Sequence, residues 1–212
     1  MPEARSGGAA GAAPVRAVIP RATYRLQLNA ALSLRDATRL VPYLAALGVS
    51  HVYCSPYFRA RPGSVHGYDV VDHNSINPEI GTREDLEEFI RTLRAHGMGH
   101  ILDIVPNHVG IMGADNAWWM DVLENGAASA YAQFFDIDWQ SLDPALGGKV
   151  LVPVLGDPYG SVLERGELEL RFDCASGSLA VFYHEHRFPL DPRTYPLVLE
   201  RALELEPARK LS

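Results

Sequence analysis

The sequence predicts an α/β fold that begins with a parallel β-sheet, and three observations lead to this prediction. Short apolar segments alternate with amphipathic segments of helical period through the first half of the chain. The connections between them are short, which is typical of right-handed βαβ units. The segment at residues 99–105 is apolar on both faces, as in a parallel strand covered on both sides. The expected strands are residues 22–28, 49–54 and 99–105.

The first expected helix has clear signals at both ends. Ser33 and Asp36 have the spacing of a capping box, in which each side chain bonds the other residue's backbone N–H. Apolar residues then recur at helical spacing, and Gly48 follows as a left-handed stop. Pro42 lies inside this stretch, so it predicts a kink or a fresh helix start there.

The second expected helix has the same design. Thr82 and Asp85 form its capping box, and Gly97 ends it. Within it, Glu87 is placed to meet Arg91 one turn later. Together with the first helix, it connects the three strands in a β-α-β-α-β order.

The second half of the chain has a different pattern. It predicts short helices near residues 115–125, an antiparallel hairpin of residues 167–173 with 179–186, and a last helix at 195–206. The division that follows is a disordered leader at 1–19, a first unit at 20–108 and a mixed α+β subdomain at 109–212. Three parallel strands do not close a domain, and the third would present an apolar edge. We therefore expect the chain to be the front part of something larger.

Composition excludes several classes of protein. The net charge of −7 and the pI near 5.6 argue against nucleic acid or an anionic membrane as the main partner. No stretch approaches the roughly 18 apolar residues that would span a bilayer. Cys54 and Cys174 do not make a disulfide framework, so we expect two reduced thiols in a cytoplasmic protein.

Polar side chains are expected at the carboxyl ends of the parallel strands, where ligands of α/β proteins bind. Asp103 lies in the apolar third strand, where a charge is costly unless it is paired or used. Asn107 and His108 follow that strand directly. A purely structural interpretation, with Asp103 paired to an arginine and the other two capping a turn, is equally compatible with the spacing. The residues expected on this rim are Gln27, Ser55, Tyr57, Asp103, Asn107 and His108.

Aromatic and histidine residues elsewhere have simpler interpretations beside the functional ones. The long loop after the second strand contains His66, Gly67 and Tyr68, and Tyr68 is either a packed turn residue or a ring on which a sugar stacks. Trp118 and Trp119 are more often core than ligand platform. His184 and His186 are expected on one strand face and resemble half a metal site, but no third ligand follows, so no metal is expected.

Two of these segments carry a family resemblance. Residues 102–108 and 66–69 resemble signature regions of the α-amylase superfamily. More narrowly, residues 23–28, 53–57, 66–81 and 152–156 resemble the maltooligosyltrehalose synthase family. The resemblance extends from about Pro20 to about Leu199. It implies the first three strand-helix units of a (β/α)8 TIM barrel, followed by a subdomain inserted after the third strand.

The resemblance also implies a function. Members of this family convert the reducing-end α-1,4 linkage of a maltooligosaccharide to an α,α-1,1 linkage by intramolecular transglycosylation, with no cofactor. His66, Tyr68 and His108 would hold the sugar, with Asp103 as support. The family's catalytic carboxylates come from later strands, so we expect none here and no activity from this chain without the carboxyl-terminal part of the enzyme.

Two other functions remain open from the sequence. The chain could be a non-catalytic maltooligosaccharide-binding module that retains half of a site. It could also belong to a hydrolytic α-amylase relative. Loss of binding on Tyr68→Ala would support the first of these, and accumulation of glucose and shorter chains in the complete enzyme would support the second.

Overall fold

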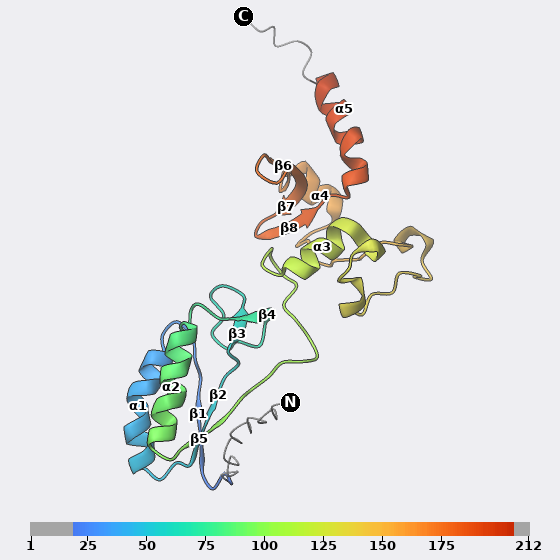
Figure 1. The fold of residues 1–212 in the computed structure, drawn as a ribbon. Helices are drawn as coiled ribbons and strands as arrows, with labels where there is room; N and C mark the ends of the chain where they lie inside the picture. The colour runs from blue at the N-terminus through green and yellow to red at the C-terminus, as the bar shows by residue number, and fades with distance from the viewer. Residues whose placement is uncertain (1–18, 206–212) are drawn as a thin grey trace, which may run out of the picture.

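The computed structural model describes residues 19–205, so the expected leader at 1–19 lies outside the described residues except for Ile19. Figure 1 shows two parts, an α/β part in blue and green and a second part in yellow to red, joined by an extended segment that follows strand β5. The first part contains the expected strands and helices. The second contains the mixed subdomain.

The first part is a three-stranded parallel sheet with two helices on one face. Its strands have the order β1-β2-β5 and are β1 (Thr23–Leu26), β2 (His51–Cys54) and β5 (Gly99–Ile101). Helices α1 (Leu34–Ala46) and α2 (Arg83–Ala95) connect them. Both pairings are parallel, with Arg25 opposite Tyr53 and Tyr53 opposite Ile101. The predicted β-α-β-α-β order is confirmed.

Helix α1 begins with the predicted capping box between Ser33 and Asp36, and Gly48 beyond its end has φ +88°. Of the two alternatives predicted for Pro42, the fresh helix start is wrong, because α1 continues through this residue as one helix. Pro42 is exposed. Water can therefore satisfy the carbonyl that loses its partner to the proline ring, which lowers the cost of the proline.

Helix α2 also begins with its predicted capping box, between Thr82 and Asp85, and Gly97 follows its end with φ +65°. The predicted partner of Arg91 is wrong. Arg91 pairs with Glu88 at 2.7 Å, one position further along the helix than Glu87. Both spacings bring side chains together on a helix surface, and Glu88 is the nearer in this rotamer.

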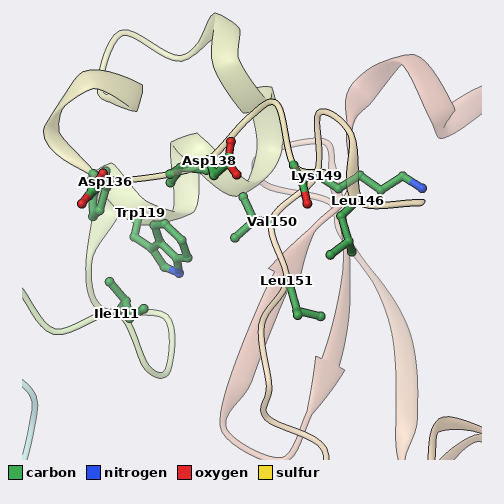
Figure 2. A pocket seen from close by; sticks show the side chains of 11 residues that line it. Ile111, Trp119, Asp136, Asp138, Leu146, Lys149, Val150 and Leu151 are labelled. Carbon is green, nitrogen blue, oxygen red and sulfur yellow. The ribbon is translucent and has the colours of Figure 1, made fainter. Parts of the chain in front are cut away.

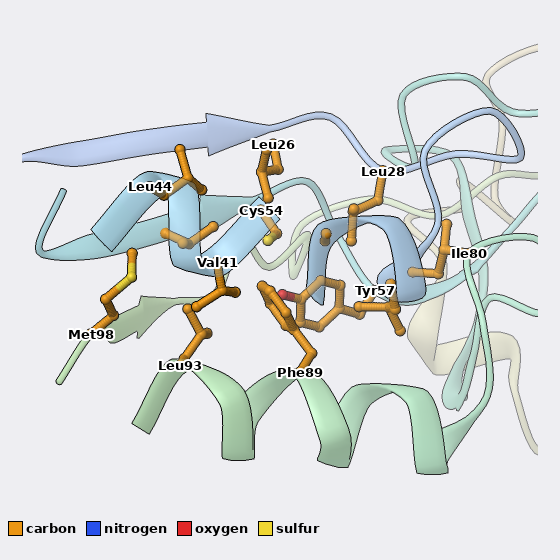
Figure 3. Close-up of a cluster of buried hydrophobic side chains, with 13 residues drawn as sticks. Leu26, Leu28, Val41, Leu44, Cys54, Tyr57, Ile80, Phe89, Leu93 and Met98 are labelled. Carbon is orange, nitrogen blue, oxygen red and sulfur yellow. The ribbon is translucent and has the colours of Figure 1, made fainter. Parts of the chain in front are cut away.

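The core of this part lies between the sheet and the two helices (Figure 3). Phe89 and Leu93 of α2 meet Val41 and Leu44 of α1 and the helix-facing side of the sheet, and Phe89 is 0% exposed. The remaining members are the following residues: Leu26, Leu28, Leu34, Ala37, Val52, Cys54, Tyr57, Ile80 and Met98.

The third strand differs from its prediction. It ends at Ile101, and two of the apolar residues after it are not covered: Leu102 is 59% exposed and Ile104 60% exposed, whereas Val105 is buried. Among the described residues, β5 is the edge of the sheet, so no further strand lies beside it. Within the described residues, the expected cover on both faces is therefore wrong for Leu102 and Ile104.

The long loop also contains structure that the sequence did not predict. Strands β3 (Phe58–Ala60) and β4 (Val70–Ile76) pair antiparallel, with register shifts, on either side of residues 61–69. This small sheet shortens the free loop and holds its two ends together. The loop that carries His66 and Tyr68 therefore leaves from an anchored base.

The second part is built on an antiparallel sheet with order β6-β7-β8. The predicted hairpin is confirmed, but the prediction that His184 and His186 lie on one strand face is wrong. His184 has φ 51° in the turn between β7 and β8, and His186 begins β8.

The α-helices and strands of the second part are α3 (Ala117–Asn125), α4 (Tyr159–Glu164), β6 (Leu168–Asp173), β7 (Ser178–Tyr183), β8 (His186–Pro189) and α5 (Tyr195–Leu205). Single 3-10 turns occupy Gly126–Ala128, Ala132–Phe134, Pro144–Leu146 and Pro192–Thr194.

Other features bear on the predicted class of protein. Cys54 is buried and Cys174 exposed, and both thiols are free. Within residues 19–205, none of the helices combines the length and apolar character needed to cross a membrane. The same residues contain no group of three or more His, Cys, Asp or Glu placed to hold a metal ion.

Candidate functional site

The register of the parallel sheet creates a polar cluster on the face opposite the helices. Arg25 and Tyr53 are Cα partners on neighbouring strands, and Tyr53 is the partner of Ile101. Side chains of a strand alternate between faces, so Asp103, two residues beyond Ile101, lies on this same side. The three side chains therefore meet although they are up to 78 residues apart.

Asp103 is the centre of this cluster. Its Oδ2 accepts hydrogen bonds from Tyr68 Oη at 2.5 Å, Tyr53 Oη at 2.9 Å and Arg25 Nη1 at 3.0 Å. The Arg25 guanidinium also donates to Tyr68 Oη at 3.0 Å and lies over the Tyr53 ring at 4.5 Å. Asp103 Oδ1 accepts nothing from residues 19–205 and reaches solvent, so it can accept a hydrogen bond from a ligand hydroxyl.

These contacts determine the charges of the cluster. Burial by itself would raise the pKa of Asp103, but hydrogen bonds from Tyr68, Arg25 and Tyr53 outweigh it and hold that pKa below its ordinary value. The hydrogen bond to Asp103 raises the pKa of Tyr68. At neutral pH the cluster therefore holds an ionised Asp103, the Arg25 guanidinium and a neutral Tyr68 phenol. Asp103 is an ionised acceptor with its charge balanced by Arg25, and such a group is a poor proton donor.

The loop at residues 61–69 brings Tyr68 to the cluster. Gly67 has φ +77°, and a Cβ there would lie 3.2 Å from the Pro56 carbonyl oxygen, so the turn needs glycine. Ser64 Oγ accepts from the Gly67 N–H at 3.1 Å and donates to Asp69 at 2.5 Å. From the end of β1, Gln27 Nε2 donates to the His66 carbonyl at 3.1 Å. The ring of Tyr68 is thus fixed from both its backbone and its hydroxyl.

The two predicted histidines flank Tyr68 and are exposed. His66 Nδ1 accepts from the Tyr68 N–H at 3.0 Å, and the two rings are stacked with centroids 6.1 Å apart. His108 Nε2 donates to the Tyr68 carbonyl at 3.1 Å, and its Nδ1 lies 3.1 Å from Asn107 Oδ1. His66 Nε2 has no hydrogen-bond partner among the described residues, whereas both nitrogens of the exposed His108 ring have a neighbouring oxygen.

The structure thus brings the four residues predicted for the site, His66, Tyr68, Asp103 and His108, together around Tyr68. The rim prediction is wrong for two other residues. Ser55 is 1% exposed and donates to Leu28, while Tyr57 is 8% exposed and bonds His100 Nε2 at 2.6 Å on the helix side. Both are part of the packing between sheet and helices.

Three contributors were not singled out from the sequence: Arg25, Tyr53 and the anchoring role of Gln27. The sequence did contain an indication for Arg25. Arg25 and Gln27 are polar residues two positions apart in an expected strand, which places both side chains on one face. The sequence does not state which strand lies beside β1. The pairing of Arg25 with Asp103 could therefore not be assigned from spacing.

Of the two tryptophans in α3, Trp119 is a core residue as expected, whereas Trp118 is only half-buried. Trp119 is 5% exposed and belongs to a second apolar cluster with Met120 and Val122. Trp118 is half-buried and stacks on Tyr131, with centroids 5.3 Å apart and an interplanar angle of 8°. His186 accepts a hydrogen bond from the Gly113 N–H at 3.2 Å, which gives it a structural function.

Comparisons with known proteins agree with the geometry. Residues 33–154 match the family model described as the α-amylase catalytic domain. The chain is 43% identical over 169 residues to a putative maltooligosyl trehalose synthase of Mycobacterium tuberculosis, covering 73% of this chain and 22% of that protein. The maltooligosyltrehalose synthase structure from Arthrobacter ramosus superposes with a TM-score of 0.71 at 45% identity, over 82% of this chain and 22% of the other.

A further solved structure of a maltooligosyl trehalose synthase gives a TM-score of 0.74 at 37% identity, again over 22% of its own chain. The chain therefore spans 22% of the length of these relatives. The superposed parts share a fold of mixed α/β sheets. On the family match and these identities, the chain belongs to the α-amylase family and is a homologue of the maltooligosyltrehalose synthases within it.

Proposed function

We propose that residues 20–108 are the first three strand-helix units of an α-amylase-type (β/α)8 barrel and that residues 109–212 are a subdomain inserted after its third strand. Two observations support this. The three strands are parallel and in sequential order, as in the fold of such barrels. Leu102 and Ile104 beyond β5 are exposed, which is where a fourth barrel strand would cover them.

We propose that the chain forms the amino-terminal part of an intramolecular transglycosylase. The reaction converts the reducing-end α-1,4 linkage of a maltooligosaccharide to an α,α-1,1 linkage. The observation that carries the proposal is the cluster of Tyr68 on Asp103 and Arg25, flanked by two exposed histidines. It offers a fixed aromatic ring and open hydrogen-bonding edges, the combination that a sugar ring requires.

The roles follow from the contacts. Tyr68 supplies a ring face for the sugar, and the Asp103–Arg25 pair holds that ring in place through its hydroxyl. His66 and His108 present imidazole edges to sugar hydroxyls. Asp103 also offers Oδ1 as an acceptor. None of these groups is the nucleophile or the acid of the reaction, because the one carboxylate among them is held ionised by three donors.

The chemistry itself requires two further carboxylates. In a retaining reaction one attacks the anomeric carbon and the other protonates the leaving oxygen, then accepts a proton from the attacking hydroxyl. The released glucose must turn within the site and capture the glycosyl-enzyme before water does, which demands a closed pocket. We assign these carboxylates and the closing wall to the remaining part of the enzyme.

Two measurements on the 212-residue chain test the proposal. Titration calorimetry with maltopentaose is expected to show a binding component that Tyr68→Ala removes, whereas Tyr43→Ala, an exposed tyrosine on α1, retains it. Incubation with maltopentaose is expected to leave the number of reducing ends unchanged. A calorimetric titration that Tyr68→Ala leaves unchanged would refute the assigned site, and loss of reducing ends would refute the division of the catalytic machinery.

A further inference from the structure

The second part of the molecule contains a hollow that the proposed function does not use. It has a volume of about 380 Å³ and lies between α3 and the segment 135–151. This volume is within the range of small-molecule sites, roughly 300–1,000 Å³. Figure 2 shows its wall, with Ile111 on one side, Trp119 in the middle and Leu151 opposite.

The wall includes an aromatic corner with an unused hydrogen-bond donor. Trp119 and Phe135 lie with ring centroids 5.0 Å apart. Trp119 is 5% exposed, and its indole N–H has no acceptor among residues 19–205. No fully buried polar side-chain atom in this part of the chain lacks a partner, so the indole nitrogen reaches the hollow. In Figure 2 the indole points into the space between Ile111 and Leu151.

The rim of the hollow supplies acceptors. Asp136 and Asp138 are both exposed and line it, together with Ser141. Asp136 accepts no hydrogen bond from the described residues, while Asp138 Oδ1 accepts only the Gln140 N–H at 3.0 Å. Lys149 also lines the hollow and donates to the Ala145 carbonyl at 3.0 Å. An aromatic corner with both donors and carboxylates around it matches a ligand that has apolar C–H faces and many hydroxyls. A purely apolar occupant would leave the indole N–H without an acceptor, whereas a sugar hydroxyl supplies one.

We propose that this hollow is a second maltooligosaccharide-binding site, which takes one glucosyl unit of an α-glucan. The choice of glucose over another polyol rests on the proposed function. The sugar packs its C–H face on Trp119 and Phe135, receives the indole N–H, and donates its hydroxyls to Asp136 and Asp138. The hollow lies on the subdomain, so this site is separate from the Tyr68 cluster.

The chain has three tryptophans, so its indole N–H resonances report directly on the hollow. In ¹H–¹⁵N spectra of the full chain, millimolar maltopentaose is expected to shift the Trp119 resonance and leave those of Trp118 and Trp139 in place. Trp119→Phe keeps an aromatic ring and removes the donor, and calorimetry in the Tyr68→Ala background is expected to show binding at this site weakened roughly fivefold. Trp118→Phe, on the same helix but outside the hollow, is the matched control.

A second variant keeps the proposal testable if Trp119→Phe does not fold. Asp136→Ala with Asp138→Ala changes only exposed side chains and is expected to abolish the Trp119 shift while the other two resonances stay in place. The Tyr68→Ala variant is expected to retain the shift, so failure of the Tyr68 site and failure of this one are distinguishable. An unchanged Trp119 resonance in the unmodified chain, or a shift that persists in the double variant, would overturn the proposal.

Discussion

The two parts of the chain bury their apolar residues to different extents. In the α/β part, helices α1 and α2 seal one face of the sheet, and Leu34, Val41 and Phe89 are each 0% exposed. In the subdomain, Leu142 is 101% exposed, Leu151 70% and Leu203 77%. In the α/β part, the two capped helices cover one face of the sheet, so the core between them is fully buried. The second part has a smaller cluster around Trp119 and leaves much apolar surface in water.

The open surfaces of the two parts differ in kind. Beside the sealed core, the α/β part exposes a narrow apolar edge at Leu102 and Ile104, while the face of its sheet opposite the helices carries the charged cluster at Asp103. The comparison shows that a complete core on one face of a sheet and an uncovered apolar segment beside that sheet can occur in one chain. The following experiments test this contrast between the two parts, from the largest expected effect to the smallest.

Truncation in the sealed core is expected to have the largest effect. Phe89→Ala removes a fully buried ring between α2 and the sheet, so it is expected to lower the free energy of unfolding by about 3–5 kcal/mol. Leu170→Ala in the subdomain, at a side chain 51% exposed, is expected to change it by no more than about 0.5 kcal/mol. Urea unfolding followed by circular dichroism measures both. Equal costs for the two would contradict the contrast between the parts.

Overpacking at the start of the third strand comes next. A Cβ on Gly99 would lie 2.2 Å from His51 Nε2, and the buried His51 ring cannot simply move because Ser50 holds its Nδ1. Gly99→Ala is expected to cost about 1–3 kcal/mol. Gly160→Ala, where a Cβ meets nothing within 4 Å, is the control and is expected to be neutral or slightly stabilising. Thermal unfolding of both variants tests whether the close contact between Gly99 and the His51 ring contributes to stability.

The charged cluster is expected to contribute less, because Arg25 is only partly shielded from water, with its side chain 33% exposed. Arg25→Met leaves the Asp103 carboxylate with two phenols and no cation, at an expected cost of about 1–2 kcal/mol. Arg39→Met, at an exposed pair with Asp36, is expected to cost under about 0.5 kcal/mol. A double-mutant cycle with Asp103→Asn separates the interaction from its surroundings; additive costs would show that Arg25 and Asp103 do not act together.

The smallest expected effect is a dependence of stability on pH. Burial lowers the pKa of His100, which packs between Tyr57 and Phe89. The unfolded chain therefore takes up a proton before the folded one as the pH falls below about 6.5. Stability is expected to be fully present above that pH and to decline below it. Urea midpoints at a series of pH values measure this.

The matched pair for this experiment is His100→Gln and His96→Gln. The first is expected to flatten the decline, since the buried imidazole is gone. His96, exposed beyond the end of α2, is expected to leave the slope unchanged. If the first variant keeps the full slope, His100 is not its source.

Local signals predicted the helices well and the loop poorly. The capping boxes at Ser33 and Thr82 involve residues three apart, so the chain carries this information wherever it folds. The strands β3 and β4 were missed because they are short and irregular, and their pairing depends on a turn without strong hairpin signals. The fresh helix start at Pro42 was misjudged because the sequence does not reveal which side of the helix faces water.

The sequence by itself determined the order of strands and helices, the polar residues after the strands and the family resemblance that points to His66, Tyr68, Asp103 and His108. Only the tertiary structure decided that Arg25 and Tyr53 join Asp103, that Tyr57 turns toward the helices, and that Leu102 and Ile104 stay uncovered. The reason is physical. Caps and periodicity arise between near neighbours in the chain, whereas sheet register and burial depend on which distant segments are present to pack.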